Sequence, residues 1–147
     1  MRKNIEFYFQ NSENLDKVFD AYDETFDRIK YFEDSLKAGA VDNPVVTQEV
    51  LKELVAIYSW LNVTTKIAES YKETAEAKHY TKLKMEAETK GEKVSNASLE
   101  KETDLFISNY RRICNIFTGY RDSCDRMISV LQSCLKSTDR EKSLPHD

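Results

Sequence analysis

Lysines gather near the end of a long helical stretch, residues 67–93, with a spacing suited to contacts with phosphates. At 100° per helical residue, Lys78 and Lys82 lie within about 40° of each other and nearly opposite a face of glutamates. Lysines contact phosphates, and tyrosine rings stack on bases. The stretch predicts a contact with nucleic acid made by Lys78, Tyr80, Lys82, Lys84, Lys90 and Lys93. The alternative is that these lysines are solvated and pair with nearby glutamates, as charge runs on long helices usually do.

A second basic cluster follows further along the chain, at Arg111, Arg112, Arg121 and Arg126. These arginines flank an apolar seam of the same helix. We expect them first to form salt bridges between helices or to cover apolar surface, and only second to contact nucleic acid.

The sequence gives little support for catalysis or metal binding. HExxH, GxSxG, Walker A, GxGxxG and EF-hand patterns do not occur. The two histidines are His79 and His146, and a single ExxH pattern joins Glu76 to His79. A di-metal bundle site needs a second copy. We therefore expect no catalytic residue, no metal, no cofactor and no enzymatic activity.

Three cysteines, Cys114, Cys124 and Cys134, follow one another at intervals of ten residues. Their number is odd and no CxxC pattern occurs, which disfavours a disulfide framework or a zinc site. Two of them fall on the apolar seam, where a cysteine acts as a small hydrophobic residue. We expect reduced and buried thiols.

The composition indicates one mostly helical domain of 147 residues, with 33% charged residues, 3 Gly and 2 Pro. Its net charge of −4 arises in residues 1–43, and the remainder is balanced. Such a charge distribution is not typical of a protein that binds nucleic acid through a large overall positive charge. No apolar run approaches the ~18 residues of a membrane span, and no secretory signal is visible. We expect a cytoplasmic protein that does not bind membranes.

The N-terminal third predicts an acidic helix. Residues 2–9 favour an extended arm or a ragged helix start over a short strand. Apolar residues then recur every three or four positions over 12–38, with Ser12 as the N-cap and Gly39 just past the end. A linker over residues 40–46 follows, with a turn at Asn43 and Pro44.

The middle third predicts one uninterrupted helix from Thr47, its expected N-cap, to the break at Gly91. It would extend about 65 Å at 1.5 Å per residue. Its second half is rich in alanine and charge. A helix this long and polar usually projects or coils with a partner.

The C-terminal third predicts a helix that carries a heptad pattern, with Ser95, Asn96 or Ser98 as its N-cap, followed by a frayed tail over 136–147. The apolar spacing alternates between four and three, as in helices packed along their length. We expect an oligomerisation seam made by Phe106, Tyr110, Ile113, Phe117, Tyr120, Met127 and Leu131, continued by Cys124 and Cys134.

These elements predict an all-α fold, a long helical hairpin or bundle with a C-terminal heptad-patterned oligomerisation helix. One domain would span residues 1–147. It would comprise an acidic arm and helix (1–43), a long helix with a basic end (44–94), and the heptad helix and tail (95–147).

The segments IYSWLN at 57–62 and YTKLKM at 80–85, joined by an unbroken helical run, resemble the UvsY family of phage recombination mediators. The resemblance covers roughly residues 50–137. In that family a Lys-x-Arg-type pair on the long helix is implicated in binding single-stranded DNA, and the C-terminal region forms ring-like homo-oligomers. Lys82 and Lys84 look like the basic pair, with a lysine in place of the arginine.

The resemblance implies a recombination mediator that binds single-stranded DNA as a homo-oligomer. It would help to load a recombinase onto strands coated by single-strand binding protein, in the host cytoplasm if the protein is phage-encoded. The alternative is a helical protein-binding module, such as an inhibitor of a host defence enzyme or an assembly factor. That module would use its acidic face and would not bind DNA.

Overall fold

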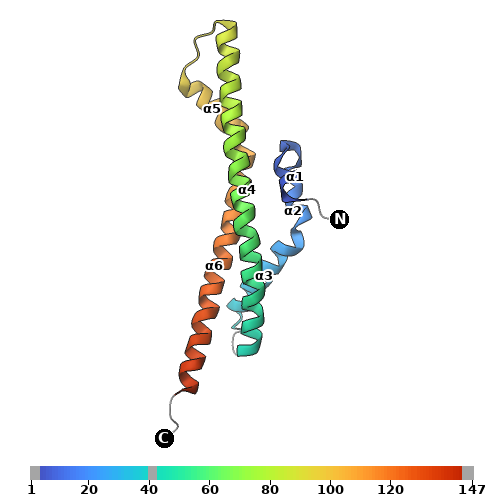
Figure 1. Ribbon diagram of the computed structural model, residues 1–147, viewed down its shortest axis with the longest axis vertical. Helices are drawn as coiled ribbons and strands as arrows, with labels where there is room; N and C mark the ends of the chain where they lie inside the picture. The colour runs from blue at the N-terminus through green and yellow to red at the C-terminus, as the bar shows by residue number, and fades with distance from the viewer. Residues whose placement is uncertain (1–3, 40–42, 144–147) are drawn as a thin grey trace. The chain divides into compact units, whose positions relative to one another are not determined.

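Every regular element in the computed structural model is a helix, over the residues it describes, 4–39 and 43–143. The prediction of an all-α fold is confirmed. Figure 1 shows the course of the chain, with α4 as its longest helix. The elements are α1 (Ile5–Phe9), the 3-10 helix η1 (Ser12–Asn14), α2 (Lys17–Ala21), α3 (Asp23–Lys37), α4 (Pro44–Lys90), α5 (Asn96–Phe106) and α6 (Ser108–Lys142).

The described residues fall into two compact units. The first unit draws on residues 1–21 and 64–117, and the second on residues 22–63 and 118–147. Both α4 and α6 contribute one part of their length to each unit. Each unit buries its own set of apolar side chains.

The first unit is centred on Phe9, whose side chain is 1% exposed. The Phe9 ring lies 6.2 Å from the ring of Tyr71 on α4 and 6.1 Å from that of Phe117 on α6, measured between centroids. Leu15 and Ile113 are fully buried in the same unit. The segment expected as an arm or a ragged helix start is therefore a short helix that packs into the core.

The second unit is centred on an aromatic cluster around Phe26 of α3. Its ring centroid lies 4.6 Å from that of Tyr120 on α6 and 6.4 Å from that of Trp60 on α4. Ile29 and Leu61 are fully buried alongside. One apolar stripe from each of three helices thus forms this core, which agrees with their helical periodicity.

The prediction of one helix over 12–38 is wrong, because this stretch forms η1, α2 and α3. The expected N-cap Ser12 is the first residue of η1, and the cap is Asn11, whose Oδ1 accepts a hydrogen bond from the backbone N–H of Glu13 (3.0 Å). The break before α3 coincides with the change of unit after Ala21. The apolar residues on either side of it are therefore buried in different cores.

The start of α4 is also earlier than predicted, at Pro44 instead of Thr47. Asn43 caps it, with its Oδ1 accepting from the N–H of Val45 at 3.0 Å. Proline suits the first helical position, where its missing N–H costs no hydrogen bond. The expected linker is thus helical from Pro44 onward, and its residues 40–42 lie outside the described ranges.

The glycine that was expected to end α4 does so. Gly91 has a φ of +66°, the N–H of Glu92 bonds the carbonyl of Ala87 at 3.0 Å, and that of Gly91 bonds Glu88 at 3.2 Å. This is the Schellman pattern. Gly39, with a φ of +80°, follows α3 in the same left-handed conformation.

The C-terminal third contains two helices, where one was predicted. Of the three candidate caps, Ser95 is the one that caps α5, since its Oγ accepts from the N–H of Ser98 (3.2 Å). The helix then stops at Phe106, and Ile107 takes the non-helical φ and ψ of −87° and 2°. The expected frayed tail is helical as far as Lys142. Its residues 144–147 lie beyond the described part.

Candidate nucleic-acid interface

A groove of about 440 Å³ opens in the first unit, between α1, α4 and the junction of α5 with α6. Its lining combines aromatic rings with two of the predicted lysines. The residues that line it are Phe9, Gln10, Tyr71, Thr74, Ala75, Lys78, His79, Lys82, Phe106 and Tyr110. Two further hollows of this unit, one along α4 and one near the start of α6, have no aromatic side chain in their lining.

Lys78 and Lys82 stand one helical turn apart on α4, and both are exposed. The Nζ of Lys82 lies 3.9 Å from Oε1 of Glu86, and the Lys82 side chain keeps 70% of its surface exposed. Lys78 forms no ion pair with any described residue. An exposed ion pair such as Lys82–Glu86 contributes little energy. The ammonium groups of both Lys78 and Lys82 therefore remain available to an anion.

The same face of α4 continues beyond the groove. An open surface that starts at Lys78 and Lys82 passes Met85, which is 61% exposed, and reaches Lys90. Lys78, Lys82 and Lys90 therefore border one stretch of this helix. Lys93 is exposed in the segment that follows α4.

Lys84 lies apart from this stretch. At 100° per residue it lies about 160° around the helix from Lys82, and it lines neither hollow. The two lysines that resemble the basic pair of the UvsY family therefore do not share a face.

Tyr80, the predicted stacking residue, also lies outside the groove. It is about 160° around α4 from Lys82, and its hydroxyl lies 3.4 Å from Oδ1 of Asn96 at the start of α5. Its ring is half-buried. The aromatic rings that do share the groove with the lysines are those of Phe9, Tyr71, His79, Phe106 and Tyr110.

The imidazole of His79 and the phenyl ring of Phe106 are stacked, with centroids 3.8 Å apart and planes 4° from parallel. Phe106 is nevertheless 47% exposed. It is the last residue of α5, immediately before the break at Ile107. The heptad spacing predicted Phe106 as part of the seam and did not predict this stack, because no glycine or proline marks the break between α5 and α6.

The floor of the groove is formed by buried aromatic side chains. Tyr110 is 6% exposed, and its hydroxyl donates to the backbone carbonyl of Phe9 at 3.4 Å. Burial raises the pKa of Tyr110 above its usual value. Tyr110 therefore stays neutral at physiological pH, and the positive charge at the groove comes from Lys78 and Lys82.

The predicted oligomerisation seam is largely buried within the chain itself. Ile113 and Phe117 are completely buried, Tyr110 and Met127 are each 6% exposed, and Leu131 is 2% exposed. Tyr120 is half-buried, and Phe106 is the most exposed of the seven. The structure describes one chain, so an interface between copies stays a prediction. Such an interface would have to use the side chains that remain exposed.

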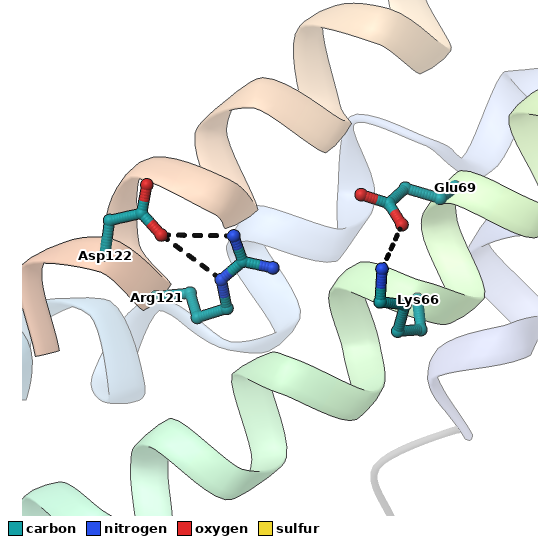
Figure 2. Close-up of polar contacts among 4 residues, drawn as sticks. All are labelled: Lys66, Glu69, Arg121 and Asp122. Atoms are coloured by element: carbon teal, nitrogen blue, oxygen red, sulfur yellow. Dashed lines mark hydrogen bonds and ion pairs between the residues drawn. The ribbon is translucent and has the colours of Figure 1, made fainter. Parts of the chain in front are cut away.

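Three of the four arginines next to this seam form ion pairs, and two of these pairs reach beyond α6, as first expected for the cluster. Arg111 on α6 pairs with Asp104 on α5 at 2.9 Å, and Arg112 pairs with Asp16. Arg121 instead bonds its neighbour Asp122 within α6, at 3.1 Å from Nη2 and 3.2 Å from Nε to Oδ1 (Figure 2).

Figure 2 also shows a pair within α4, Lys66 with Glu69, at 3.0 Å from Nζ to Oε2. The two residues are three positions apart on the helix. This lysine lies outside the predicted interface, and its partner is one of the glutamates on the face opposite Lys78 and Lys82. Pairing with nearby glutamates is thus found for Lys66 and Lys82.

The cysteines are free, with Cys114 and Cys124 buried and Cys134 partly exposed. Burial raises the pKa of Cys114, and it raises the pKa of Cys124 to about 11. Among the residues that the structure describes, no three His, Cys, Asp or Glu side chains are grouped to hold a metal ion. His146 is outside those residues.

None of the helices, over the described part of the chain, has the length and apolar character needed to cross a membrane. Comparison with protein-family models, with curated proteins and with solved structures gives no match.

Proposed function

We propose that this chain binds single-stranded DNA in the groove of its first unit and acts as a non-enzymatic recombination mediator. The observation that carries the DNA-binding step is that Lys78 and Lys82 line one groove together with several aromatic rings, the partly exposed Phe106 among them. Lysines neutralise phosphates, and aromatic rings stack on bases that have no pairing partner. This combination is typical of proteins that bind single strands with little sequence preference.

The path of the strand follows the exposed face of α4. Lys78 and Lys82 contact the phosphates next to the groove, and Lys90 extends the path along the same helix face. Lys93 adds positive charge past the end of α4. A few lysines on a chain with a net charge of −4 make a weak site.

Several copies of the chain turn this weak site into a useful one. When linked copies bind one strand, each further contact is intramolecular, and overall affinity rises by orders of magnitude without a new contact. The contact between copies uses exposed apolar side chains such as Val63 and Val130, which are 60% and 51% exposed. A mediator of this kind would hold the strand while single-strand binding protein is exchanged for a recombinase.

The first test is the binding of a fluorescent oligo-dT at several salt concentrations. Affinity should fall as salt rises, because cations leave the strand when lysines bind it. The variant Lys78→Ala/Lys82→Ala should reduce the slope of log K against log salt by roughly 1.4, about 0.7 for each lost phosphate contact. The matched control Lys84→Ala/Lys101→Ala also removes two exposed charges but should leave the slope unchanged.

Two outcomes would contradict the proposal. Wild-type protein that does not bind oligo-dT at low salt would exclude the DNA-binding step. Equal losses in both double variants would show that general charge, and not the groove, causes binding. The mediator step is tested separately, by whether the protein speeds assembly of a recombinase on strands precoated with single-strand binding protein. The mass from light scattering, with and without oligo-dT, tests self-association.

The acidic protein-binding module is less well supported. That module would bind through the acidic face of α3. Two aspartates of this face are paired with lysines three residues further along the helix, Asp27 with Lys30 at 3.7 Å and Asp34 with Lys37 at 4.0 Å. These lysines share the face with the aspartates and reduce its negative charge. A chain that binds no DNA would nevertheless restore this alternative.

A further inference from the structure

A half-exposed phenyl ring lies beside the lysines of the groove. Phe106 keeps 47% of its surface exposed, although its neighbour Ile107 is fully buried and Tyr110 is 6% exposed. One face of the ring is covered by His79. No other ring of the described chain contacts Phe106, and the side chain lines the groove. The uncovered surface of the ring is thus available to a planar ligand.

The stack with His79 fixes the orientation of this ring. The two planes are only 4° from parallel, and the centroids are 3.8 Å apart. A ring held in this way loses little rotational freedom when a ligand stacks on its other face, so more of the stacking energy appears as affinity. The position of Phe106 at the end of α5, before the non-helical Ile107, places the ring beside α4.

Positive charge flanks the ring on the same helix as His79. Lys78 precedes His79 directly, and Lys82 follows it by three residues; both line the groove with Phe106. A nucleotide presents a planar base and a phosphate a few ångströms apart. The groove therefore offers one surface for each part of it. Lys82 keeps 70% of its side chain exposed, so it can reach a phosphate without leaving a buried partner.

We propose that Phe106, supported by His79, stacks on one unpaired base, and that this stack makes the groove select single-stranded over double-stranded DNA. The inference rests on the proposed function and deepens it, because Lys78 and Lys82 alone would bind any phosphate backbone. A base in a duplex already has neighbours stacked on both faces and cannot offer one to Phe106. A base in a single strand can turn toward the ring at a much lower cost.

The test compares three probes: oligo-dT, an oligomer of equal length built from abasic deoxyribose phosphates, and a duplex. Wild-type protein should bind oligo-dT more tightly than either of the others. Phe106→Ala should weaken the binding of oligo-dT roughly 5- to 150-fold, the loss expected for one base–aromatic stack. It should leave binding of the abasic oligomer and the salt slope unchanged. Phe106→Trp should restore the preference for oligo-dT.

The matched control is Leu105→Ala, which removes an adjacent apolar side chain that is 68% exposed and does not line the groove. This variant should bind all three probes as wild type does. Circular dichroism shows whether each variant is folded, and the Phe106→Trp variant keeps the test valid if Phe106→Ala is unstable.

The results separate the inference from the proposed function. If wild type binds no probe, the proposed function fails and the inference fails with it. If wild type binds oligo-dT but Phe106→Ala keeps its preference over the abasic oligomer, only the inference is overturned. It is also overturned if Phe106→Ala lowers the mass of the protein in light scattering, because the ring would then belong to an interface between copies.

Discussion

Arg28 of α3 donates two parallel hydrogen bonds to the carboxylate of Glu53 on α4. The distances are 2.7 Å from Nε to Oε1 and 2.9 Å from Nη2 to Oε2. The guanidinium also lies over the rings of Phe32 and Tyr31, at 4.5 Å and 5.0 Å from their centroids. This arrangement joins two helices of the second unit, and only arginine has the planar geometry that makes all of these contacts.

Glu53→Gln should lower the free energy of unfolding by about 0.5–1 kcal/mol at pH 7, since the pair is roughly half exposed. The hydrogen bond from Arg28 lowers the pKa of Glu53 below its ordinary value of 4.5. The folded state therefore favours the charged carboxylate, and the contribution is complete above pH 4.5 and lost as the pH falls through the lowered value. Urea unfolding at pH 7 and at pH 3 should show that the difference from wild type is smaller in acid.

The control for this pair is Lys37→Ala, which removes a more exposed contact of 4.0 Å with Asp34. It should change stability by much less. A Glu53→Gln effect of equal size at both pH values would contradict the role assigned to the charged carboxylate.

Only one of the three thiols should react quickly in the folded protein. Cys114 and Cys124 are buried, and burial raises the pKa of Cys124 to about 11, so its reactive thiolate is scarce near pH 8. A thiol-specific disulfide reagent should titrate Cys134 alone in the native protein and all three cysteines in urea. Cys134→Ser should abolish the fast reaction. A second fast thiol in that variant would disprove the burial described for Cys114 and Cys124.

Shortening a buried side chain of the heptad seam should destabilise the fold of the single chain, whether or not copies of the chain associate. Phe117 is fully buried against Phe9 and Phe19, with ring centroids 6.1 Å and 6.0 Å away. Phe117→Ala should lower the free energy of unfolding by about 3–5 kcal/mol. Val130→Ala, at a position that is 51% exposed, should cost far less. If Phe117→Ala reduced the mass of the protein and left its stability intact, the seam would act between chains.

Two glycines should respond to alanine in opposite directions. Gly91 has a φ of +66°, which strains any residue with a Cβ, so Gly91→Ala should destabilise the protein by about 1–2 kcal/mol. Gly119 lies within α6, and a Cβ built there meets no atom within 4 Å. Gly119→Ala should therefore stabilise the protein by about 0.5–1 kcal/mol. Thermal unfolding followed by circular dichroism measures both, and shifts of the same sign would contradict the helix end described at Gly91.

The sequence was most informative where a local rule decides the structure. Periodicity predicted the helical class, glycine predicted the ends of α3 and α4, and Ser95 predicted the start of α5. It failed where packing overrides a regular pattern. The apolar spacing runs unbroken through residues 12–38, yet the chain breaks before Asp23 because the residues on either side are buried in different cores.

The candidate site was predictable only in part for the same reason. Helical spacing placed Lys78 and Lys82 on one face, and the structure places both in one groove. The stacked rings could not be predicted, because Phe106 continues the heptad spacing and nothing in the local sequence marks the break at Ile107. Tyr80 was chosen for its chemistry, but Asn96 lies beside its hydroxyl on another side of α4.

Because α4 and α6 are each divided between the two compact units, neither unit corresponds to one continuous piece of sequence. A fragment that preserved either unit would have to be cut inside both helices and rejoined by an artificial linker. A truncation from either end that is long enough to remove one whole unit therefore also removes part of the other. Point substitutions on the intact chain are the appropriate tools for assigning activities to its parts.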